Sequence, residues 1–471
     1  MKPKDALFER WTEVLAQKGE SPAIFNTRGE VVLSFRQIDE HSRNFESKIH
    51  NLERASVLAV QIGNHPDWPP ILIAALKRGF VVLPLEQSIT KQQRDAALRI
   101  SNAAGIVAAG ASGTGTVTGG SLEILPVGTS AARTNWGENV PALLKLTSGT
   151  TAEPRAIRFR SEQLIADCDQ ICITKGISDA DLNFGAIPVS HSYGFSNLLT
   201  PLIARGVTMV LSSDRTPRAV LDDLARTNAT VFPGMPLFYQ AFCEMENVPP
   251  LSTLRLCISA GAPLSLGIAK KFREKFGLSI HSFYGASECG GICYDREAKL
   301  DVEGFVGAPL DGVDLETIDP NSESSQVRVR NVAAGDGYFP DANQGKLGGG
   351  IFVPDDLLAR EGDGFKIVGR VSDLINVAGK KVNPAEIEQV LLQFPGVRRA
   401  VAFGRESALR NEEVAACAVA DADVNERQLI EFCGRRLSSW QVPKRVFIVD
   451  SIPENERGKT SRKALAKRFR L

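Results

Sequence analysis

Short apolar runs alternate with amphipathic segments over residues 56–285. The apolar runs are rich in Val, Ile, Leu and Phe, which favours buried strands, while the segments between them repeat apolar residues at helical spacing. Strands are therefore predicted at residues 56–63, 81–85, 183–189, 208–213, 229–234, 254–260 and 279–285, and helices at residues 71–79, 91–103, 196–206, 218–228, 236–244 and 266–277. This alternation is typical of an α/β fold in which helices cover parallel-rich sheets.

The pattern changes near residue 370. Residues 365–394 read as a strand, a break, a hairpin and a helix, and the rest of the chain mixes strands and helices up to a basic terminal helix. About 100 residues of this kind suit a small α+β domain. We therefore predict a large N-terminal domain over residues 1–370 and a small C-terminal domain over residues 371–471.

Length and composition fit a large soluble protein. The chain has 471 residues, which is more than one core usually holds, and 43% of them are hydrophobic. Lys plus Arg and Asp plus Glu both number 55, so the net charge is zero and broad nucleic-acid binding is not expected.

Targeting, membrane and metal signals are weak. No secretory signal is visible at the N-terminus, and the apolar run at residues 68–76 is far shorter than the roughly 20 residues of a membrane span, so we expect a cytoplasmic protein. The eight cysteines have no zinc-binding spacing, so we expect reduced and mostly buried thiols.

One loop has the composition of an anion-binding site. The segment TSGTTAEPR follows an apolar strand, and Arg155 places a cation at its end. Backbone N–H groups and hydroxyls become available on five consecutive residues, Thr147, Ser148, Gly149, Thr150 and Thr151. The loop lacks the Gly-Lys-Thr ending of a P-loop, which disfavours a kinase or ATPase of that class. The alternative is a plain Ser/Thr turn.

Seven segments in order resemble motifs of the adenylate-forming enzymes, a family of acyl- and aryl-CoA ligases, luciferases and peptide-synthetase adenylation domains. The resemblance covers nearly the whole chain. The segments are LTSGTTAEPRAI (146–157), PVSHSYG (188–194), SAGAPL (259–264), FYGASECGG (283–291), VPDDL (353–357), VGRVSDLINVAGKKVNPAEIE (368–388) and IPENERGKTSRKAL (452–465).

The resemblance implies a two-step reaction that uses ATP, Mg²⁺ and a thiol. A carboxylate attacks the α-phosphate of ATP to give an acyl-adenylate and pyrophosphate, and a thiol then displaces AMP. Both partners in the first step are anions, so the site must supply positive potential. In this family the C-terminal domain rotates between the two steps.

The same resemblance assigns roles to individual residues. The loop from Thr147 to Thr151 would hold the β- and γ-phosphates, Ser287 would donate to the α-phosphate, and Glu288 would bind Mg²⁺. The remaining nucleotide contacts would come from a turn and a ring beside adenine, namely Gly261, Ala262, Pro263, Tyr284 and Gly285, and from Asp356 on the ribose hydroxyls with Arg370 nearby.

Four further residues are expected to serve the chemistry. Lys459 would bridge the carboxylate and the α-phosphate, Arg155 would add charge at the phosphate loop, and His191 would lie at the carboxylate or the mouth of the acyl tunnel. Gly379 would let the backbone approach the pantetheine arm of CoA. The alternatives are a cation of a basic tail for Lys459, a polar end of a strand for His191 and an ordinary hairpin glycine for Gly379.

Several positions depart from the family pattern. Arg155 stands where a lysine is usual, and a planar fork is not a flexible ammonium. Ala152 and Ala156 replace glycines of the phosphate loop, and Ser372 stands where the hinge residue is usually Asp or Lys. Serine tolerates a change of backbone angles, so we interpret residue 372 as a variant hinge.

The preferred interpretation is an AMP-forming acid–CoA ligase. No acidic residue stands near the histidine motif to hold an α-amino group, and no carrier domain is fused to the chain, so a fatty or aromatic acid and CoA are expected. The alternatives are transfer to an acyl carrier protein or lactone closure without CoA, and a catalytically impaired protein that binds ATP or an acyl-adenylate. The sequence leaves open which acid is used and whether the protein is a monomer or a homodimer.

Overall fold

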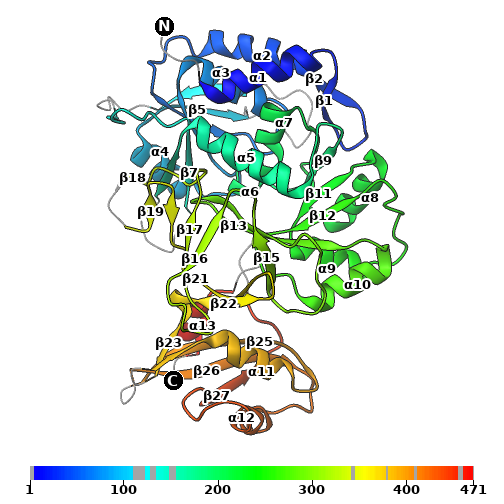
Figure 1. Cartoon of the computed structure of the whole chain (residues 1–471), viewed down its shortest axis with the longest axis vertical. Coiled ribbons are helices and arrows are strands. Elements are labelled where there is room, and N and C mark those ends of the chain that lie inside the picture. Colours follow the sequence, from blue (N-terminus) through cyan, green and yellow to red (C-terminus); the bar gives the residue numbers. More distant parts are fainter. Residues whose placement is uncertain are drawn as a thin grey trace. The chain divides into compact units, whose positions relative to one another are not determined.

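The chain folds into two compact units in the computed structural model (Figure 1). Unit 1 comprises Met1–Glu316 and Arg328–Val353, and unit 2 comprises Thr317–Val327 and Pro354–Leu471. The predicted domain boundary after residue 370 lies inside unit 2. That the C-terminal domain rotates about this point stays a prediction. The residues that the structure describes are 5–109, 122–127, 134–147, 155–340, 345–377, 380–407, 411–453 and 460–469.

The first sheet of unit 1 has a parallel centre made of β5 (Ala103–Ala109), β3 (Val57–Gln61), β4 (Val81–Pro84) and β7 (Leu143–Leu146). Its antiparallel strands are β6 (Leu122–Pro126) beside β5, and β8 (Ala156–Phe159) and β18 (Tyr338–Phe339) beyond β7. Helices α3 (Trp68–Arg78) and α4 (Lys91–Ser101) connect the parallel strands. Helix α3 ends where Gly79 adopts a φ of 71°, a left-handed conformation that glycine enters without strain. The strands and helices predicted here are confirmed.

The second sheet of unit 1 carries the predicted parallel strands in the order β10 (Thr208–Leu211), β9 (Leu182–Gly185), β11 (Val231–Gly234), β12 (Leu256–Ser259) and β13 (Ile280–Ala286). Strand β13 then turns back into the antiparallel β14 (Gly290–Tyr294), which pairs with β15 (Phe305–Pro309). The predicted helices appear as α8 (Pro217–Thr227), α9 (Pro236–Glu244) and α10 (Leu266–Phe276), and Figure 1 shows them in green beside β11 and β12. The α/β fold class is confirmed.

One predicted helix is interrupted. Residues 196–206 were expected to form a single helix, but the structure has a π-helical turn at Phe195–Leu199 followed by α7 (Thr200–Arg205). Pro201 has no N–H for the carbonyl of Asn197, and that carbonyl instead accepts a hydrogen bond from the side-chain amide of Asn183 at 3.1 Å. The wider turn is therefore a consequence of the missing proline donor.

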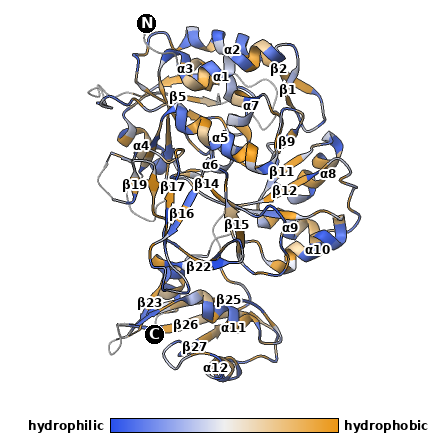
Figure 2. Ribbon diagram, in the orientation of Figure 1, coloured by the Kyte–Doolittle hydropathy of each residue, from blue (hydrophilic) through white to orange (hydrophobic). Residues whose placement is uncertain are grey.

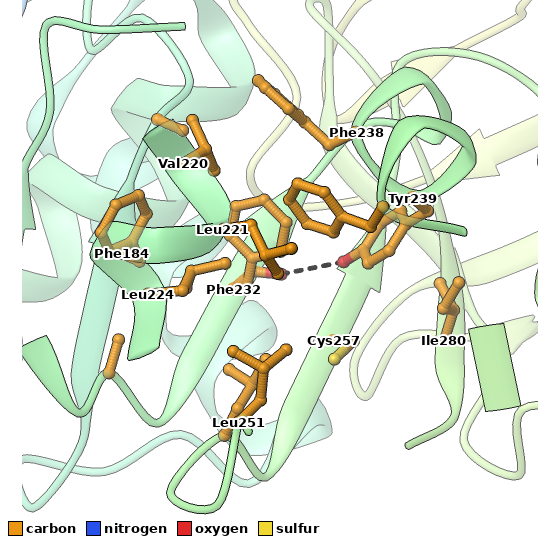
Figure 3. Close-up of a cluster of buried hydrophobic side chains, with 14 of the residues drawn as sticks. Phe184, Val220, Leu221, Leu224, Phe232, Phe238, Tyr239, Leu251, Cys257 and Ile280 are labelled. Carbon is orange, nitrogen blue, oxygen red and sulfur yellow. Dashed lines mark hydrogen bonds between the residues drawn. The ribbon is translucent and has the colours of Figure 1, made fainter. Parts of the chain in front are cut away.

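Aromatic side chains dominate a buried cluster in the second half of unit 1 (Figure 3). Phe232 on β11 packs against Phe184 and against Phe238, Tyr239 and Phe242, with ring centroids 5.6–6.2 Å apart. The hydroxyl of Tyr239 lies 2.8 Å from the carbonyl oxygen of Ile258 and 3.2 Å from that of Phe232, the second contact being the dashed line in Figure 3. This cluster joins α9 to the strands β11 and β12, and β12 leads into the segment that contains Gly261.

Unit 2 contains a hairpin, β21 (Asp356–Glu361) with β22 (Gly364–Arg370), and a sheet in the order β24 (Lys380–Val382), β23 (Ile375–Val377), β26 (Asn411–Ala420) and β25 (Val397–Ser407). Strand β27 (Arg445–Ile448) lies parallel to β26. Alternate residues of β26 face opposite sides: Ala416 and Ala418 pack with α11 (Pro384–Leu392) and α12 (Glu426–Gly434), whereas Ala415 and Cys417 pack toward α13 (Arg462–Arg468). The predicted α+β character is confirmed.

Burial follows the sequence pattern. Figure 2 shows hydrophobic residues along the strands and both hydrophobic and hydrophilic residues on most helices, as expected for helices with one buried face. All eight cysteines are free thiols and all except Cys243 are buried. Among the described residues, no helix is long and apolar enough to cross a bilayer.

The contacts of Tyr239 predict a measurable loss of stability in Tyr239→Phe. The ring still fills the cluster, but the buried carbonyls of Ile258 and Phe232 lose their shared donor, which costs about 1–3 kcal/mol. Urea unfolding would measure this change. Leu237→Ala on the same helix is the control, because that side chain is 57% exposed and should change stability by less than about 0.5 kcal/mol. Equal midpoints for wild type and Tyr239→Phe would contradict the role of the hydroxyl.

Candidate active site

The phosphate-loop segment connects two antiparallel strands. Leu146 on β7 pairs with Ala156 on β8, and the amide of Thr147 donates to the carbonyl of Arg155 at 2.8 Å. The structure thus holds the two ends of the loop together. Ser148, Gly149, Thr150 and Thr151 lie outside the described residues, so their predicted contacts with phosphate remain predictions.

The segment with Tyr284 and Glu288 forms the hairpin of β13 and β14. A Cβ on Gly285 would lie 2.7 Å from the carbonyl oxygen of Gly290, so no larger residue fits at position 285. Gly290 has a φ of +73°, and a Cβ there would lie 2.1 Å from Oδ1 of Asp167 on α5 (Ser161–Lys175). The glycines of this motif therefore permit the hairpin to press against α5, which fixes the position of Ser287 and Glu288.

The histidine motif is placed against the same hairpin. The hydroxyl of Ser192 donates to that of Ser287 at 3.0 Å, which joins two segments 95 residues apart. His191 caps the short helix α6 (Ser192–Gly194), and its Nδ1 accepts from the amide of Tyr193 at 3.3 Å. In the neutral ring this bond places the proton on Nε2. His191 is thus a helix cap, and the structure brings it to the hairpin that the sequence assigns to the nucleotide.

Glu288 lies over the strands that carry the phosphate loop. Its Oε1 accepts from the hydroxyl of Tyr338 at 3.2 Å, and its carbonyl accepts from the amide of Gly335 at 2.9 Å. Tyr338 on β18 pairs with Ile157 on β8, two residues beyond Arg155 at the end of the loop. Unit 1 therefore gathers the loop ends, Glu288 and the histidine motif in one region.

The adenine-side turn follows β12. Gly261 has a φ of +85° and no neighbour within 4 Å of a Cβ, so the backbone angle and not crowding favours glycine there. Ser259 on β12 pairs with Ser282 on β13, and the strands are parallel, so the turn of Gly261, Ala262 and Pro263 leaves the sheet at the same edge as Tyr284. This placement agrees with the predicted adenine contacts, which remain predictions.

Asp356 and Arg370 meet in unit 2. They are cross-strand partners in the hairpin of β21 and β22, and Nε of Arg370 lies 2.7 Å from Oδ1 of Asp356. The Asp356 side chain is 13% exposed and that of Arg370 52%. Val377 and Lys380 pair on either side of residues 378–379. Gly379 and Lys459 lie outside the described residues.

A buried lysine that sequence reasoning missed lies directly before the phosphate loop. Lys145 on β7 is 6% exposed, and its Nζ lies 4.6 Å from the ring centroid of Phe159 and 5.7 Å from that of Phe195. Burial lowers the pKa of Lys145, while the nearby carboxylates Asp167 and Glu288 oppose that shift. The available signal was a lysine within the apolar run of residues 142–146.

A second buried lysine supports the histidine motif. Nζ of Lys175 donates to Oδ1 of Asn197 at 2.9 Å and lies 3.3 Å from the ring centroid of Phe283. The side-chain Nδ2 of Asn197 in turn donates to the backbone carbonyl of Tyr193 at 3.0 Å. Burial lowers the pKa of Lys175 to about 7. Nothing in the sequence singled it out, because a lysine in the last turn of a helix is ordinary.

Comparisons with known proteins agree with this arrangement. The family model described as AMP-binding enzyme matches residues 11–331, and the one described as AMP-binding enzyme C-terminal domain matches residues 386–459. The chain is 30% identical over 346 residues to a probable CoA ligase of Humulus lupulus, a match that covers 69% of this chain and 65%, less than two thirds, of that protein.

Two further relatives differ in their acceptors. A feruloyl-CoA synthase of Amycolatopsis is 27% identical over 430 residues, covering 86% of this chain and 87% of that one. A 3,4-dihydroxybenzoate–[aryl-carrier protein] ligase of Bacillus anthracis is 28% identical over 346 residues, covering 70% and 75%. The fold is similar to that of ATP-bound MatB from Rhodopseudomonas palustris, with a TM-score of 0.83, 22% identity and 98% of each chain covered.

The lowered pKa of Lys175 predicts that the difference in folding stability between wild type and Lys175→Met depends on pH. The unfolded amine has a pKa near 10.5, so between about pH 7 and pH 10 the unfolded chain binds a proton that the folded chain lacks. Wild-type stability should therefore fall as the pH drops through this window, by up to about 4 kcal/mol, and level off below it. Lys175→Met lacks this loss, so its stability relative to wild type should rise toward pH 7.

Urea unfolding at a series of pH values would measure the difference between the two proteins. The exposed Lys270 on α10 provides the control, because Lys270→Met should track wild type at every pH. A difference between Lys175→Met and wild type that stays constant from pH 10 to pH 7 would contradict the lowered pKa.

Proposed function

This chain belongs to the AMP-binding enzyme family, within the adenylate-forming superfamily, and on that premise we propose that it is an AMP-forming carboxylic acid–CoA ligase. The observation that supports this most is the hydrogen bond between Ser192 and Ser287, because it joins the predicted acid-side motif to the predicted phosphate-side motif. An enzyme that couples a carboxylate to an α-phosphate needs those two surfaces side by side.

The residues of unit 1 suit the first half-reaction. Thr147 and Arg155 hold the ends of a loop whose amides and hydroxyls would bind the β- and γ-phosphates, and Ser287 would donate to the α-phosphate. His191 would orient the acid carboxylate from its position at the start of α6. These donors would stabilise the negative charge that develops on the phosphate oxygens as pyrophosphate leaves.

Glu288 fits a Mg²⁺ ion that arrives with the nucleotide. Mg²⁺ typically takes one or two carboxylates together with substrate phosphates and water. Among the described residues there is no cluster of three or more His, Cys, Asp or Glu side chains that could hold a metal ion by itself. When bound, the ion would neutralise charge on the phosphates, and the hydrogen bond from Tyr338 would keep the carboxylate of Glu288 in place.

The bonds of a buried carboxylate beside the histidine motif support an acid of one kind. Asp167 on α5 is buried and accepts from Ser196 at 2.5 Å and from the amide of Gly291 at 3.0 Å. Its carboxylate is thus committed to internal bonds and is poorly suited to hold a substrate ammonium. We propose an acid without an α-amino group, aromatic or aliphatic.

The molecule that accepts the acyl group distinguishes a CoA ligase from an enzyme that transfers to a carrier protein. ATP–pyrophosphate exchange across short, long and aromatic acids identifies the acid, and addition of CoA to the preformed adenylate then tests thioester formation. Release of AMP with an acyl-CoA product supports the ligase. Exchange without any effect of CoA would favour a carrier protein or another acceptor, and ATP binding without exchange for any acid would favour a binding protein.

Lys459 is proposed as the cation between the carboxylate and the α-phosphate. A unit charge about 4 Å from an anion is worth roughly 4 kcal/mol at an effective dielectric near 20. Loss of about 3–4 kcal/mol corresponds to roughly 10²–10³ in rate, so Lys459→Ala should reduce pyrophosphate exchange by that factor with an unchanged unfolding midpoint. Lys467→Ala in the same basic tail is the control. Near wild-type exchange in Lys459→Ala would remove this assignment.

Ser372 is proposed as the pivot between the two half-reactions. Proline fixes φ near −65° and restricts the residue before it, so Ser372→Pro should retain adenylate formation but slow its conversion to thioester at least about tenfold. Single-turnover assays with adenylate and CoA would measure the second step alone. Ser372→Ala should keep both steps, and a fully active Ser372→Pro enzyme would argue against rotation at this residue.

A further inference from the structure

The guanidinium of Arg462 is shared between three elements of unit 2. Nη1 donates to Oδ2 of Asp373 at 2.9 Å, Nη2 to Oε1 of Glu388 at 2.7 Å, and Nε to the carbonyl of Ala402 at 3.0 Å. These acceptors lie on the 3₁₀ turn Val371–Asp373, on α11 and on β25. The first residue of α13 is therefore bonded to three other segments at once.

The arrangement closes on itself. Oε1 of Glu388 also accepts from the amide of Ala402 at 2.8 Å, so Arg462, Glu388 and Ala402 form a ring of hydrogen bonds. The side chains of Arg462, Asp373 and Glu388 are 26%, 29% and 16% exposed. Burial raises the pKa of Glu388, and Arg462 opposes this shift. Only a planar fork with several fixed donors can serve these acceptors together, which a lysine cannot do.

The two lysines of α13 have no such role. Lys463 and Lys467 are exposed, and within the described part of the chain neither makes a hydrogen bond or an ion pair. Arg462 is also distinguished by its place in the sequence. It follows Lys459 by three residues, and its partner Asp373 follows Ser372 directly.

We propose that Arg462 is a positioning residue for the adenylation step. It binds Asp373 to the N-terminus of α13, so α13, which Lys459 precedes in the sequence, keeps a fixed direction relative to the proposed pivot at Ser372. Asp373 then moves together with α13, and rotation takes place at Ser372 or before it. The inference rests on the proposed function, because it takes Lys459 as the cation that acts on the phosphate.

Arg462→Met tests whether Arg462 affects the rate of adenylation, and Lys463→Met is the matched control on the same helix. We expect Arg462→Met to lower the kcat of pyrophosphate exchange at least tenfold while the KM for ATP changes less than about twofold, because all three nitrogens of the Arg462 guanidinium are bonded within unit 2. Thioester formation from preformed adenylate should fall less, since that step does not use Lys459. Wild-type exchange in Arg462→Met, or a loss confined to KM, would overturn the proposal.

A double-mutant cycle tests the partner. Asp373→Asn should slow exchange in the wild-type background but add little in the Arg462→Met background, because both changes break the same contact. Arg462→Lys should recover part of the lost rate, since an ammonium can serve one of the carboxylates. Fully additive effects of Asp373→Asn and Arg462→Met would show that the two residues act separately and would overturn the proposed link.

Hydrogen–deuterium exchange tests the link without any substrate. In Arg462→Met the amides of residues 371–374 and of residues 462–469 should both exchange faster than in wild type, and in Lys463→Met neither should change. If wild type adenylates no acid, the proposed function fails while this measurement still decides the link. Unchanged exchange over residues 371–374 in Arg462→Met would disprove it.

Discussion

The buried carboxylate of Asp167 is the contact on which the arrangement of unit 1 depends. One oxygen accepts from the hydroxyl of Ser196 in the π-helical turn, and the other accepts from the amide of Gly291 in β14. A Cβ on Gly290 would overlap that carboxylate. Helix α5 therefore holds both the turn that follows His191 and the hairpin that carries Glu288, and contacts within the protein set the spacing between the two motifs.

Part of the positive charge near the candidate site lies on a buried side chain. A chain of zero net charge has no general field to attract two anions, so positive potential has to be local. Lys145 on β7 is buried against the ring of Phe159, and the face of that ring offsets part of the cost of desolvating an ammonium. It stands two residues before Thr147, at the entry to the segment that the sequence assigns to phosphate. Lys175 contributes less charge near neutral pH, because burial lowers its pKa to about 7.

The parts of this molecule that follow periodic patterns could be predicted, and those that depend on long-range contacts could not. Seven parallel strands, β3, β4, β9, β10, β11, β12 and β13, were visible because burial on both faces selects apolar runs. Helix α5, which carries Asp167, was not predicted. The π-helical turn was missed because it depends on Pro201 and Asn183, which lie on different elements. Among site residues, the motifs predicted Arg370 near Asp356 but not the ion pair that the two form, and Lys145 and Lys175 owe their importance to rings supplied by Phe159 and Phe283.

The charged residues on either side of Ser372 form ion pairs with different segments, one earlier and one later in the sequence. Arg370 pairs back with Asp356 in β21, and Asp373 pairs forward with Arg462 in α13. In the part of the chain that the structure describes, no side-chain hydrogen bond or ion pair holds Ser372 itself. Rotation of a peptide chain concentrates where neighbouring segments are fixed and the link between them is not. The amide of Val371 donates to the carbonyl of Asp355 at 2.8 Å, so the link between the two anchored segments is Ser372. Ser372 thus meets the physical requirement for the proposed pivot, although serine replaces the charged residue that is usual there.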